Sequence, residues 1–476
     1  MSARFTQLLT PEQVKLVHEA SLEILEEVGL LVHNLKARDR FAEHGCQVDQ
    51  ETQLVKLPRE VIDHFCQAIP PQFTFHGRDP EFDRTIPDDG PLFTTASSVP
   101  DVIDPDTGEV RRARSDDIAR IAHLVNELPG YDIFSISVIA DDAPLGHYHL
   151  LRYYPALKNT LKPVLGSAPN SDEAMDILRL GILVAGNENN YRARPFLTYG
   201  VCPVISPLLM DNDSTEMLMF FAEQRLPCYC VIAPNAGMTA PMTLLGTLAQ
   251  CNAEFLATAV LSQMSRSGTP LVYAALPTVA DMRTGAYAPG GIETGILLMG
   301  CAQMARFYNV PCSGFIGLSN AKLNDAQSGY ETGLSTMAAL NAGVDLFYTG
   351  GLLDGLSVFD FAKAVMDNEI AMMLKRVKRG FEFCQENFAL DVIGQVGPGG
   401  TFLNQAHTRK RVRTTAVLPE ISDRDSRIRW EENGSFDTHT RAMRKAREIL
   451  TRDNPSKFSP DVDARIRAEF NELVTN

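Results

Sequence analysis

The chain has 476 residues, of which 45% are hydrophobic and 22% are charged, an ordinary balance for a soluble globular enzyme. Its formal net charge of −15 argues against nucleic acid or an anionic membrane as the main partner. The sequence does not open with a basic stretch and an apolar run, and its nine cysteines are scattered, so we expect no signal peptide, reduced thiols and a cytoplasmic location.

Residues 1–90 predict a helical N-terminal extension. Thr10 and Pro11 have the form of a helix N-cap followed by Pro in the first turn, and residues 14–31 show helical apolar spacing. Residues 54–68 repeat this spacing, with Pro58 starting a helix. Five prolines between residues 70 and 91 then indicate a loop-rich link.

Strand-like and helix-like segments alternate over residues 91–380. The strand-like runs are almost continuously apolar, as in a parallel sheet covered on both faces. They lie at 94–99, 133–139, 163–168, 196–204, 227–233, 270–276, 311–318 and 345–350. The helical segments lie near 115–128, 148–159, 171–187, 213–225, 241–267, 291–308, 327–342 and 358–380.

Eight such units predict an α/β fold of the closed (β/α)8 type, a TIM barrel. A doubly wound open sheet is the alternative, but its Gly-rich dinucleotide fingerprint is missing. Residues 381–476 predict a C-terminal extension that packs on the barrel and ends in helices over 436–452 and 460–472.

A barrel places its functional residues at the carboxyl ends of the strands. One of these ends is unusually polar, because the apolar run 314–318 leads directly into Ser319, Asn320 and Lys322. The strand-end candidates are Ser98, Asp141, Asp142, Ser167, Pro203 to Pro207, Asn235, Thr278, Asp281, Arg283, Ser319, Asn320, Lys322, Tyr348 and Asp354.

Two short motifs have metal-ligand spacing. His147-Tyr-His149 has the spacing of a metal pair, but it lies in a loop and no other His occurs between His149 and His407, so we favour a plain loop pair. Cys228 and Cys230 share one face of a strand and could hold zinc, although two small core residues would have the same spacing. A nucleophile elbow and a P-loop are both missing from the sequence.

Several stretches together resemble the trimethylamine methyltransferase family, including its members that lack pyrrolysine. They occur in family order along nearly the whole chain. They are Asp104-Pro-Asp-Thr-Gly-Glu-Val-Arg111, Cys202-Pro-Val-Ile-Ser-Pro-Leu208, Pro234-Asn-Ala-Gly-Met-Thr-Ala-Pro241, Asn252-Ala-Glu254, Asp325-Ala-Gln-Ser-Gly-Tyr-Glu331, Gly397-Pro-Gly-Gly-Thr-Phe-Leu403 with His407 and Thr408, and Trp430. The fold that this resemblance implies is again a TIM barrel.

The resemblance implies methyl transfer from an N-methylated amine to the cobalt of a corrinoid carried by a separate small protein. Since this chain has only standard residues, it looks like a quaternary-amine member. Glycine betaine is then the default substrate, with proline betaine, carnitine or γ-butyrobetaine as alternatives. The chain itself would hold no tightly bound cofactor. Its partners would be the cognate corrinoid protein and the small-molecule amine. We also expect a homo-oligomer.

The implied chemistry suggests which side chains contact the substrate. A trimethylammonium group prefers aromatic faces, for which Tyr199, Phe315 and Tyr348 are the strand-borne candidates, Tyr348 being preferred to its neighbour Phe347. A carboxylate prefers amide, hydroxyl or guanidinium donors, and these are expected from Arg283, Asn320, Gln327 and Tyr348.

Some of these residues have a structural alternative. Arg283 could instead pair with Asp281 or Glu293, and Glu254 and Glu331 are expected to support loops. Asp325 is expected to cap the helix that carries Gln327.

Two other functions are open at this point. One is a zinc-assisted methyltransferase centred on Cys228 and Cys230, and the other is a betaine-binding protein without catalysis.

Overall fold

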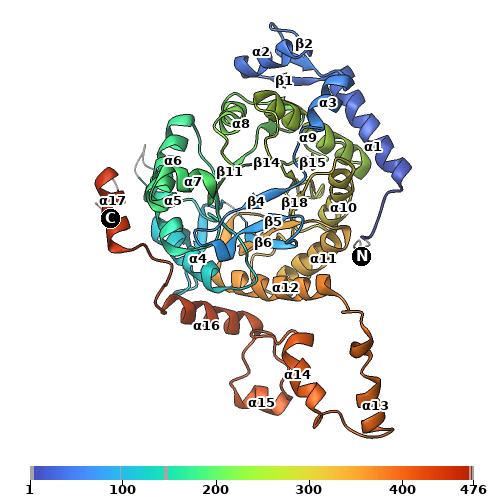
Figure 1. Cartoon of the computed structure of the whole chain (residues 1–476), viewed down its shortest axis with the longest axis vertical. Helices are drawn as coiled ribbons and strands as arrows, with labels where there is room; N and C mark the ends of the chain where they lie inside the picture. The colour runs from blue at the N-terminus through green and yellow to red at the C-terminus, as the bar shows by residue number, and fades with distance from the viewer. Residues whose placement is uncertain (1–4, 97, 144–147, 471–472, 474–476) are drawn as a thin grey trace.

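The computed structural model describes residues 5–96, 98–143, 148–470 and 473. Its centre is a barrel of eight parallel strands (Figure 1). In chain order they are β6 Leu92–Thr95, β9 Phe134–Ser135, β10 Val164–Gly166, β11 Leu197–Val201, β14 Cys228–Ile232, β16 Tyr273–Ala275, β18 Cys312–Phe315 and β19 Leu346–Gly350. Each strand pairs with the next, β19 pairs with β6, and a parallel bridge from Thr94 to Ile133 joins β6 to the start of β9. The predicted TIM barrel is confirmed.

Helices surround the barrel at the predicted places. They are α4 Ser115–Glu127, α5 Tyr148–Asn159, α6 Ser171–Ala185, α7 Glu188–Ala193, α8 Asp213–Glu223, α9 Leu244–Ser265, α10 Ile292–Phe307, α11 Ala326–Ala342 and α12 Phe361–Arg379. The segment 171–187, predicted as one helix, ends at Gly186, whose φ of +87° stops α6, and Asn187 then caps α7. Helix α9 has the length and apolar composition of a membrane span, but most of it is buried inside the fold.

The N-terminal extension mixes helices and strands. It comprises α1 Pro11–Glu23, the π-helical turn η1 Ile24–Val28, β1 Leu30–Val32, α2 Leu35–Glu43, β2 Gln47–Val48, β3 Leu54–Lys56 and α3 Arg59–Cys66. The helical spacing seen from residue 54 is wrong for Leu54 and Val55, which pair antiparallel with β1, whereas Pro58 starts α3 as predicted. Strand β1 also pairs with β13 Leu209–Met210, which ties this extension to the loop after β11.

A hairpin covers the end of the barrel where the strands begin. Its strands are β4 Phe73–Phe75 and β5 Arg84–Ile86, separated by the short 3-10 turn η2 Pro80–Phe82. Asp83 forms an ion pair with Arg194 (2.7 Å), and the Arg78 amide donates to the Leu161 carbonyl (2.8 Å). Because Leu161 and Arg194 lie just before β10 and β11, the hairpin spans the N-terminal end of the barrel, across the centre of the ring in Figure 1.

Short strands extend the opposite end, where the barrel strands stop. Strands β7 Asp101–Ile103, β8 Val110–Arg112, β20 Leu352–Leu353 and β21 Val358–Asp360 form one four-stranded sheet. Strands β15 Asn235–Ala236 and β17 Thr278–Val279 pair with each other, and β12 Val204–Ile205 pairs with β13. We call this carboxyl-terminal end of the barrel the mouth.

The C-terminal extension first leaves the barrel and then returns to it (Figure 1). Its elements are the 3-10 turn η3 Gln385–Phe388, α13 Leu390–Val396, α14 Ala406–Thr415, α15 Arg427–Glu432, α16 Thr438–Leu450 and α17 Pro460–Glu469. Helix α16 packs against α12 and α4, and α17 is joined to α5 by an ion pair between Asp463 and Lys158 (3.0 Å). We call the part that projects, residues 380–435, the arm.

Candidate active site at the barrel mouth

Strand alternation decides which side chains of β18 and β19 face the lumen. A Cβ on Gly314 would lie 2.7 Å from the Leu298 side chain of α10, so Gly314 faces the helices and its neighbour Phe315 faces the lumen. Phe347 stacks on Phe93, with ring centroids 4.9 Å apart, on the outer face of the barrel. Tyr348 therefore faces the lumen, as the sequence predicted in preferring it to Phe347.

Three aromatic rings meet inside the lumen, and we call them the aromatic trio. Phe315 and Tyr348 stack with centroids 4.2 Å apart at an interplanar angle of 17°, and Tyr229 lies 5.2 Å from Tyr348. The Tyr229 hydroxyl donates to Ser313 Oγ, which in turn donates to the Leu346 carbonyl (3.0 Å). Burial raises the pKa of Tyr348 well above its ordinary value, so the lumen contains a neutral aromatic surface.

Three strands near the mouth carry buried polar atoms without a hydrogen-bond partner. Within the described ranges these atoms include Ser135 Oγ, Asn235 Oδ1 and Tyr348 Oη, which come from β9, β15 and β19. Buried polar groups in native proteins are nearly always paired, so each of these atoms is a candidate contact for a polar ligand. Asn235 and Tyr348 were among the sequence candidates, whereas Ser135, which lies within its strand, was not.

The polar loop after β18 is organised by Glu331 of α11. Its carboxylate accepts hydrogen bonds from Ser319 Oγ (2.7 Å), the backbone N–H of Asn320 (2.9 Å) and Gln327 Nε2 (2.9 Å). Asp325 caps α11 by accepting from the Gln327 amide, as predicted. Ser319 and Gln327 thus serve the loop through Glu331, whose supporting role was expected.

Asn320 connects this loop to the loop that follows β17. Its Nδ2 donates to the Tyr287 carbonyl (2.9 Å), and its Oδ1 accepts from the Gly290 amide (2.9 Å). Both polar atoms of the Asn320 side-chain amide are therefore hydrogen-bonded. Asn320, like Gln327, supports the loops in this structure. Glu254 of α9 acts similarly on the loop after β11, where it accepts from Ser206 Oγ (2.7 Å) and the Leu208 amide (3.0 Å).

A buried network holds the ends of β18 and β19 together. Lys363 of α12 forms an ion pair with Asp367 and donates to Thr332 Oγ1 (2.9 Å). Thr332 donates in turn to the Gly317 carbonyl (2.7 Å) after β18, while Asp367 accepts from the Gly351 amide (2.9 Å) after β19. The network fixes the backbone on both sides of the aromatic trio.

Two predicted substrate contacts are not in the lumen. The Arg283 side chain is 87% exposed and pairs with Asp281 (2.7 Å), which was the structural alternative for it. Tyr199 stacks on Phe221 of α8, with centroids 4.6 Å apart, and faces the helices. The reason is strand register: Tyr199 lies opposite Cys228, which places Gly200 rather than Tyr199 beside the lumen-facing Tyr229.

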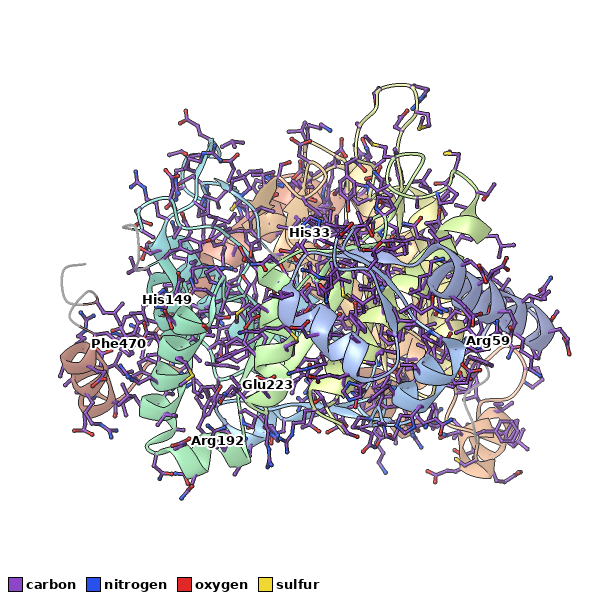
Figure 2. The ribbon with its side chains drawn as sticks, turned by 90° about the horizontal axis from the view of Figure 1, so that it is seen from above. His33, Arg59, His149, Arg192, Glu223 and Phe470 are labelled. Carbon is purple, nitrogen blue, oxygen red and sulfur yellow. The ribbon has the colours of Figure 1, made fainter. Side chains whose placement is uncertain are left out.

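Neither of the two metal hypotheses gains a complete ligand set among the described residues. Cys228 and Cys230 have sulfurs 3.8 Å apart, but they alternate with Tyr229 and so face the helices. His149 lies on the flank of the barrel between Glu173 (2.9 Å) and Asp176 (3.3 Å) of α6 (Figure 2), and His147 lies outside the described residues. In the part of the chain that the structure describes, His, Cys, Asp and Glu form no group of three able to hold a metal.

Sequence analysis missed a cation at the mouth. Arg152 of α5 is 4% exposed and donates to Ser98 Oγ (3.0 Å) and Ser167 Oγ (3.1 Å), two of the strand-end candidates. It was missed because it lies within a helix, not at a strand end. The signal available was a single arginine in the apolar run from Leu150 to Tyr154.

Apolar side chains are exposed on the rim of the mouth. Met238, Met242 and Met282 are each more than half exposed and lie in the loops after β14 and β16. A Cβ on Gly237 would lie 2.9 Å from the sulfur of Met282 and 3.0 Å from that of Met242, so the two loops carry their methionines to one place. We call these three residues the methionine rim.

Comparison with known proteins gives full-length matches. The family model described as trimethylamine methyltransferase (MTTB) matches residues 2–472. The glycine betaine methyltransferase of Desulfitobacterium hafniense strain Y51 is 33% identical over 464 residues, covering 97% of this chain and 96% of the relative. The trimethylamine methyltransferase MttB of D. hafniense strain DSM 10664 / DCB-2 is 30% identical, with 97% and 92% coverage, and that of Methanosarcina thermophila is 29% identical, with 96% and 95% coverage.

Proposed function

Because the chain belongs to the trimethylamine methyltransferase family and is a methyltransferase, we propose that it moves a methyl group from a quaternary amine to the cobalt(I) of a corrinoid protein. The observation that carries this proposal is the aromatic trio in the lumen of a barrel of this family. Glycine betaine is the first candidate, since one relative over 30% identical is named for it. Proline betaine, carnitine and γ-butyrobetaine carry the same kind of cationic group.

The aromatic trio suits a quaternary ammonium because a ring face attracts a cation that has no N–H to donate. Phe315 and Tyr348 stack on each other, so a cation would meet an outer face of this stack, and Tyr348 stays neutral because burial raises its pKa. A quaternary ammonium leaves as a neutral amine, so the reaction does not require a general acid. The two tyrosine hydroxyls of the aromatic trio are poor acids because burial raises their pKa values, and this fits such a substrate.

This chain would contribute alignment to the reaction, and the nucleophile would come from the partner. The corrinoid, held by that separate protein, supplies the cobalt that accepts the methyl group. Glu254 and Glu331 fix two of the mouth loops through their hydrogen bonds, and Asn320 joins one loop to the next. Loops fixed in this way can hold the methyl group in line for attack and keep water away.

The methionine rim supports docking of the corrinoid protein over the mouth. Met238, Met242 and Met282 expose flexible apolar side chains, which suit a surface that must receive another protein. Their position at the mouth would bring the partner's cofactor above the aromatic trio. The nine cysteines are all free thiols, which supports a cytoplasmic enzyme.

The direct test combines the purified enzyme with a reduced corrinoid protein and each candidate betaine. The cobalt(I) absorbance is followed with time, and dimethylglycine serves as the tertiary-amine control. We expect the cobalt(I) signal to disappear with at least one quaternary amine and to persist with the control. Persistence with every quaternary amine would exclude the proposed substrate class.

The two rival functions have their own tests. Zinc-assisted transfer is disfavoured because Cys228 and Cys230 face the helices, and stoichiometric zinc lost in Cys230→Ser would reverse this judgement. A binding protein without catalysis would show tight betaine binding by calorimetry and no methyl transfer.

A further inference from the structure

Arg152 carries a buried positive charge that no carboxylate of the described chain neutralises. Its guanidinium donates to two serine hydroxyls, Ser98 Oγ (3.0 Å) and Ser167 Oγ (3.1 Å), and its Nε has no hydrogen-bond partner among the described residues. Arginine is rarely buried without a counter-charge, because desolvation of an unpaired ion costs several kcal/mol. The site therefore favours an anion from outside the chain.

The two serines place this guanidinium at the mouth. Ser98 follows β6 and Ser167 follows β10, so both lie where the strands end. A Cβ on Gly166 would lie 2.5 Å from the Tyr153 hydroxyl of α5, which means that Gly166 faces the helices and Ser167 faces the lumen. Since Ser167 is exposed, the anion site is open to solvent at the mouth.

The guanidinium and the aromatic trio lie on different parts of the same wall. Strand β10 is separated from β14, which carries Tyr229, only by β11. With strands about 4.8 Å apart, the two sites are roughly 10 Å apart along the wall. A small zwitterion inside the lumen can therefore contact both, with its cation on the rings and its anion on Arg152.

We propose that Arg152 binds the carboxylate of a zwitterionic betaine substrate, an inference that rests on the proposed function. A guanidinium has five N–H donors in a planar fork, and the serines use two of them, which leaves Nε–H and two others for a carboxylate. Tyr148, whose ring lies 5.2 Å from Arg152 Cζ, supports the plane of the fork. This assigns to Arg152 the role that the sequence suggested for Arg283.

The assignment also explains a preference between amines. A betaine adds a carboxylate that neutralises the buried charge, whereas trimethylamine brings no anion and leaves Arg152 unpaired. The chain should therefore discriminate by charge at the end of the substrate that does not react.

Calorimetry of the full-length enzyme tests this inference without turnover. The ligands are glycine betaine and γ-butyrobetaine, each compared with its methyl ester, which lacks the carboxylate charge. We expect wild type to bind at least one acid 10-fold to 100-fold more tightly than its ester. Arg152→Met should reduce this ratio to within about 3-fold while leaving ester affinity nearly unchanged, and Arg152→Lys should restore part of it.

Arg283→Met is the matched control, because it removes a guanidinium that is exposed and already paired. Its acid-to-ester ratio should equal that of wild type. An unchanged ratio in Arg152→Met, equal loss of acid and ester binding, or binding of neither acid by wild type would overturn the inference.

Failure of the Arg152 inference and failure of the proposed methyl transfer give different experimental results. Methyl transfer from a betaine with an unchanged KM in Arg152→Met would overturn the role of Arg152 and leave the function standing. A preference for the acids that depends on Arg152, without any methyl transfer, would support the role of Arg152 and overturn the proposed function.

The arm supports a second, independent inference, because it has no core of its own. No residue between Leu374 and Ile421 is buried, although this stretch is rich in large apolar side chains. Those exposed on the arm are Phe381, which is 97% exposed, Phe383, Phe388, Leu390, Ile393, Phe402, Leu403, Val412, Leu418 and Ile428. A soluble monomer rarely exposes so many together, so the arm is built to be covered.

The position of the arm limits what can cover it. The arm continues from the last turn of α12, and barrel helices run opposite to the strands, so it starts at the N-terminal end of the barrel. Arg376 fixes it there by donating to the Thr415 carbonyl (2.8 Å). A corrinoid protein docked at the mouth would lie at the other end of the barrel and would not cover the arm.

We infer that the arm packs against a second copy of this chain. A cavity of about 650 Å³, lined by Phe381, Phe383, Phe388 and Arg411 among others, offers a receptor for apolar side chains. Helix α14 contributes a cluster of cations, Arg409, Lys410, Arg411 and Arg413, in a chain whose net charge is −15. A basic helix on an acidic protein is complementary to another copy of that protein.

Sedimentation equilibrium of the full chain tests the arm. We expect wild type to be oligomeric at micromolar concentration, and Phe381→Asp/Phe383→Asp to raise the dissociation constant at least 100-fold with an unchanged circular dichroism spectrum. Leu16→Asp/Met175→Asp is the control, since both residues are exposed and lie outside the arm. A monomeric wild type, or an arm variant that assembles as wild type does, would overturn the inference.

Discussion

Replacing Lys363 with methionine should destabilise the protein by about 3–5 kcal/mol, because it leaves Asp367 buried without its counter-charge. Both side chains are essentially inaccessible to solvent, at 1% and 0% exposure. Asp367→Asn should cost a similar amount, since it leaves the ammonium of Lys363 unpaired. The pair thus provides two singly charged variants of one buried site.

The double variant Lys363→Met/Asp367→Asn should be less damaging than either single change. It contains no buried charge, and the Asn side chain can still accept from the Gly351 amide as Asp367 does. The remaining loss is that of the Lys363 hydrogen bond to Thr332, about 1–2 kcal/mol. We therefore expect a coupling energy of roughly 2 kcal/mol or more in the double-mutant cycle.

The pH dependence gives a second readout from the same variants. Burial raises the pKa of Asp367, and Lys363 opposes this rise. A carboxyl group whose pKa is raised in the folded state stabilises the fold fully below its unfolded pKa and loses that contribution as the pH rises through the folded value. The loss caused by Lys363→Met should therefore be larger at pH 8 than at pH 5.

Urea unfolding followed by far-ultraviolet circular dichroism at both pH values measures these differences. The Thr336→Val variant is a useful control, because its hydroxyl donates to the Thr332 carbonyl nearby but carries no charge. Additive single and double variants, or a Lys363→Met loss that is equal at pH 5 and pH 8, would refute the explanation by a buried charge.

Three further predictions concern binding, pH and docking. Tyr348→Leu should weaken betaine binding about 10-fold in calorimetry and Tyr348→Phe much less, because a ring face contributes ~1–2 kcal/mol to a desolvated cation; equal losses would contradict the role of the ring. Burial raises the pKa of Asp345 to about 6, so the contribution of Asp345 to stability should fall as the pH rises from about 4 to above 6, and Asp345→Asn should be more stable than wild type by up to about 3 kcal/mol at pH 8 but not at pH 4; the same difference at both pH values in urea unfolding would contradict it. Met238→Asp should raise the KM for the corrinoid protein several-fold while betaine affinity, measured by calorimetry, stays unchanged, and a loss of betaine affinity would mean that the rim contacts the substrate.

The barrel could be predicted from the sequence because its strands are short and apolar on both faces. Runs such as 227–233 and 345–350 carry no alternation that would suit an exposed sheet, and each leads into a helix of regular spacing. Pro58 starts a helix as predicted, but the helical spacing before it was misleading, since Leu54 and Val55 are held by pairing with β1, a contact distant in sequence. Pattern alone does not contain that pairing.

The candidate site was harder to predict than the fold. A strand-end position is local information, but which face it presents depends on register, and this excluded Tyr199 while placing Tyr348 in the lumen. Asn320 and Gln327 are engaged through Glu331 and the Gly290 amide, partners that only the folded loops bring together. Arg152 reaches the mouth from a helix, so a search restricted to strand ends could not find it.

The hairpin of β4 and β5 bears on the kinetic order of the proposed reaction. Because Phe73 and Phe75 are buried across the N-terminal end of the barrel, the proposed amine and its demethylated product would pass through the mouth, where we propose that the corrinoid protein docks. The amine would then enter before the partner arrives, and the product would leave only after the partner departs. This arrangement predicts a compulsory-order reaction, in which a slowly dissociating partner would limit turnover.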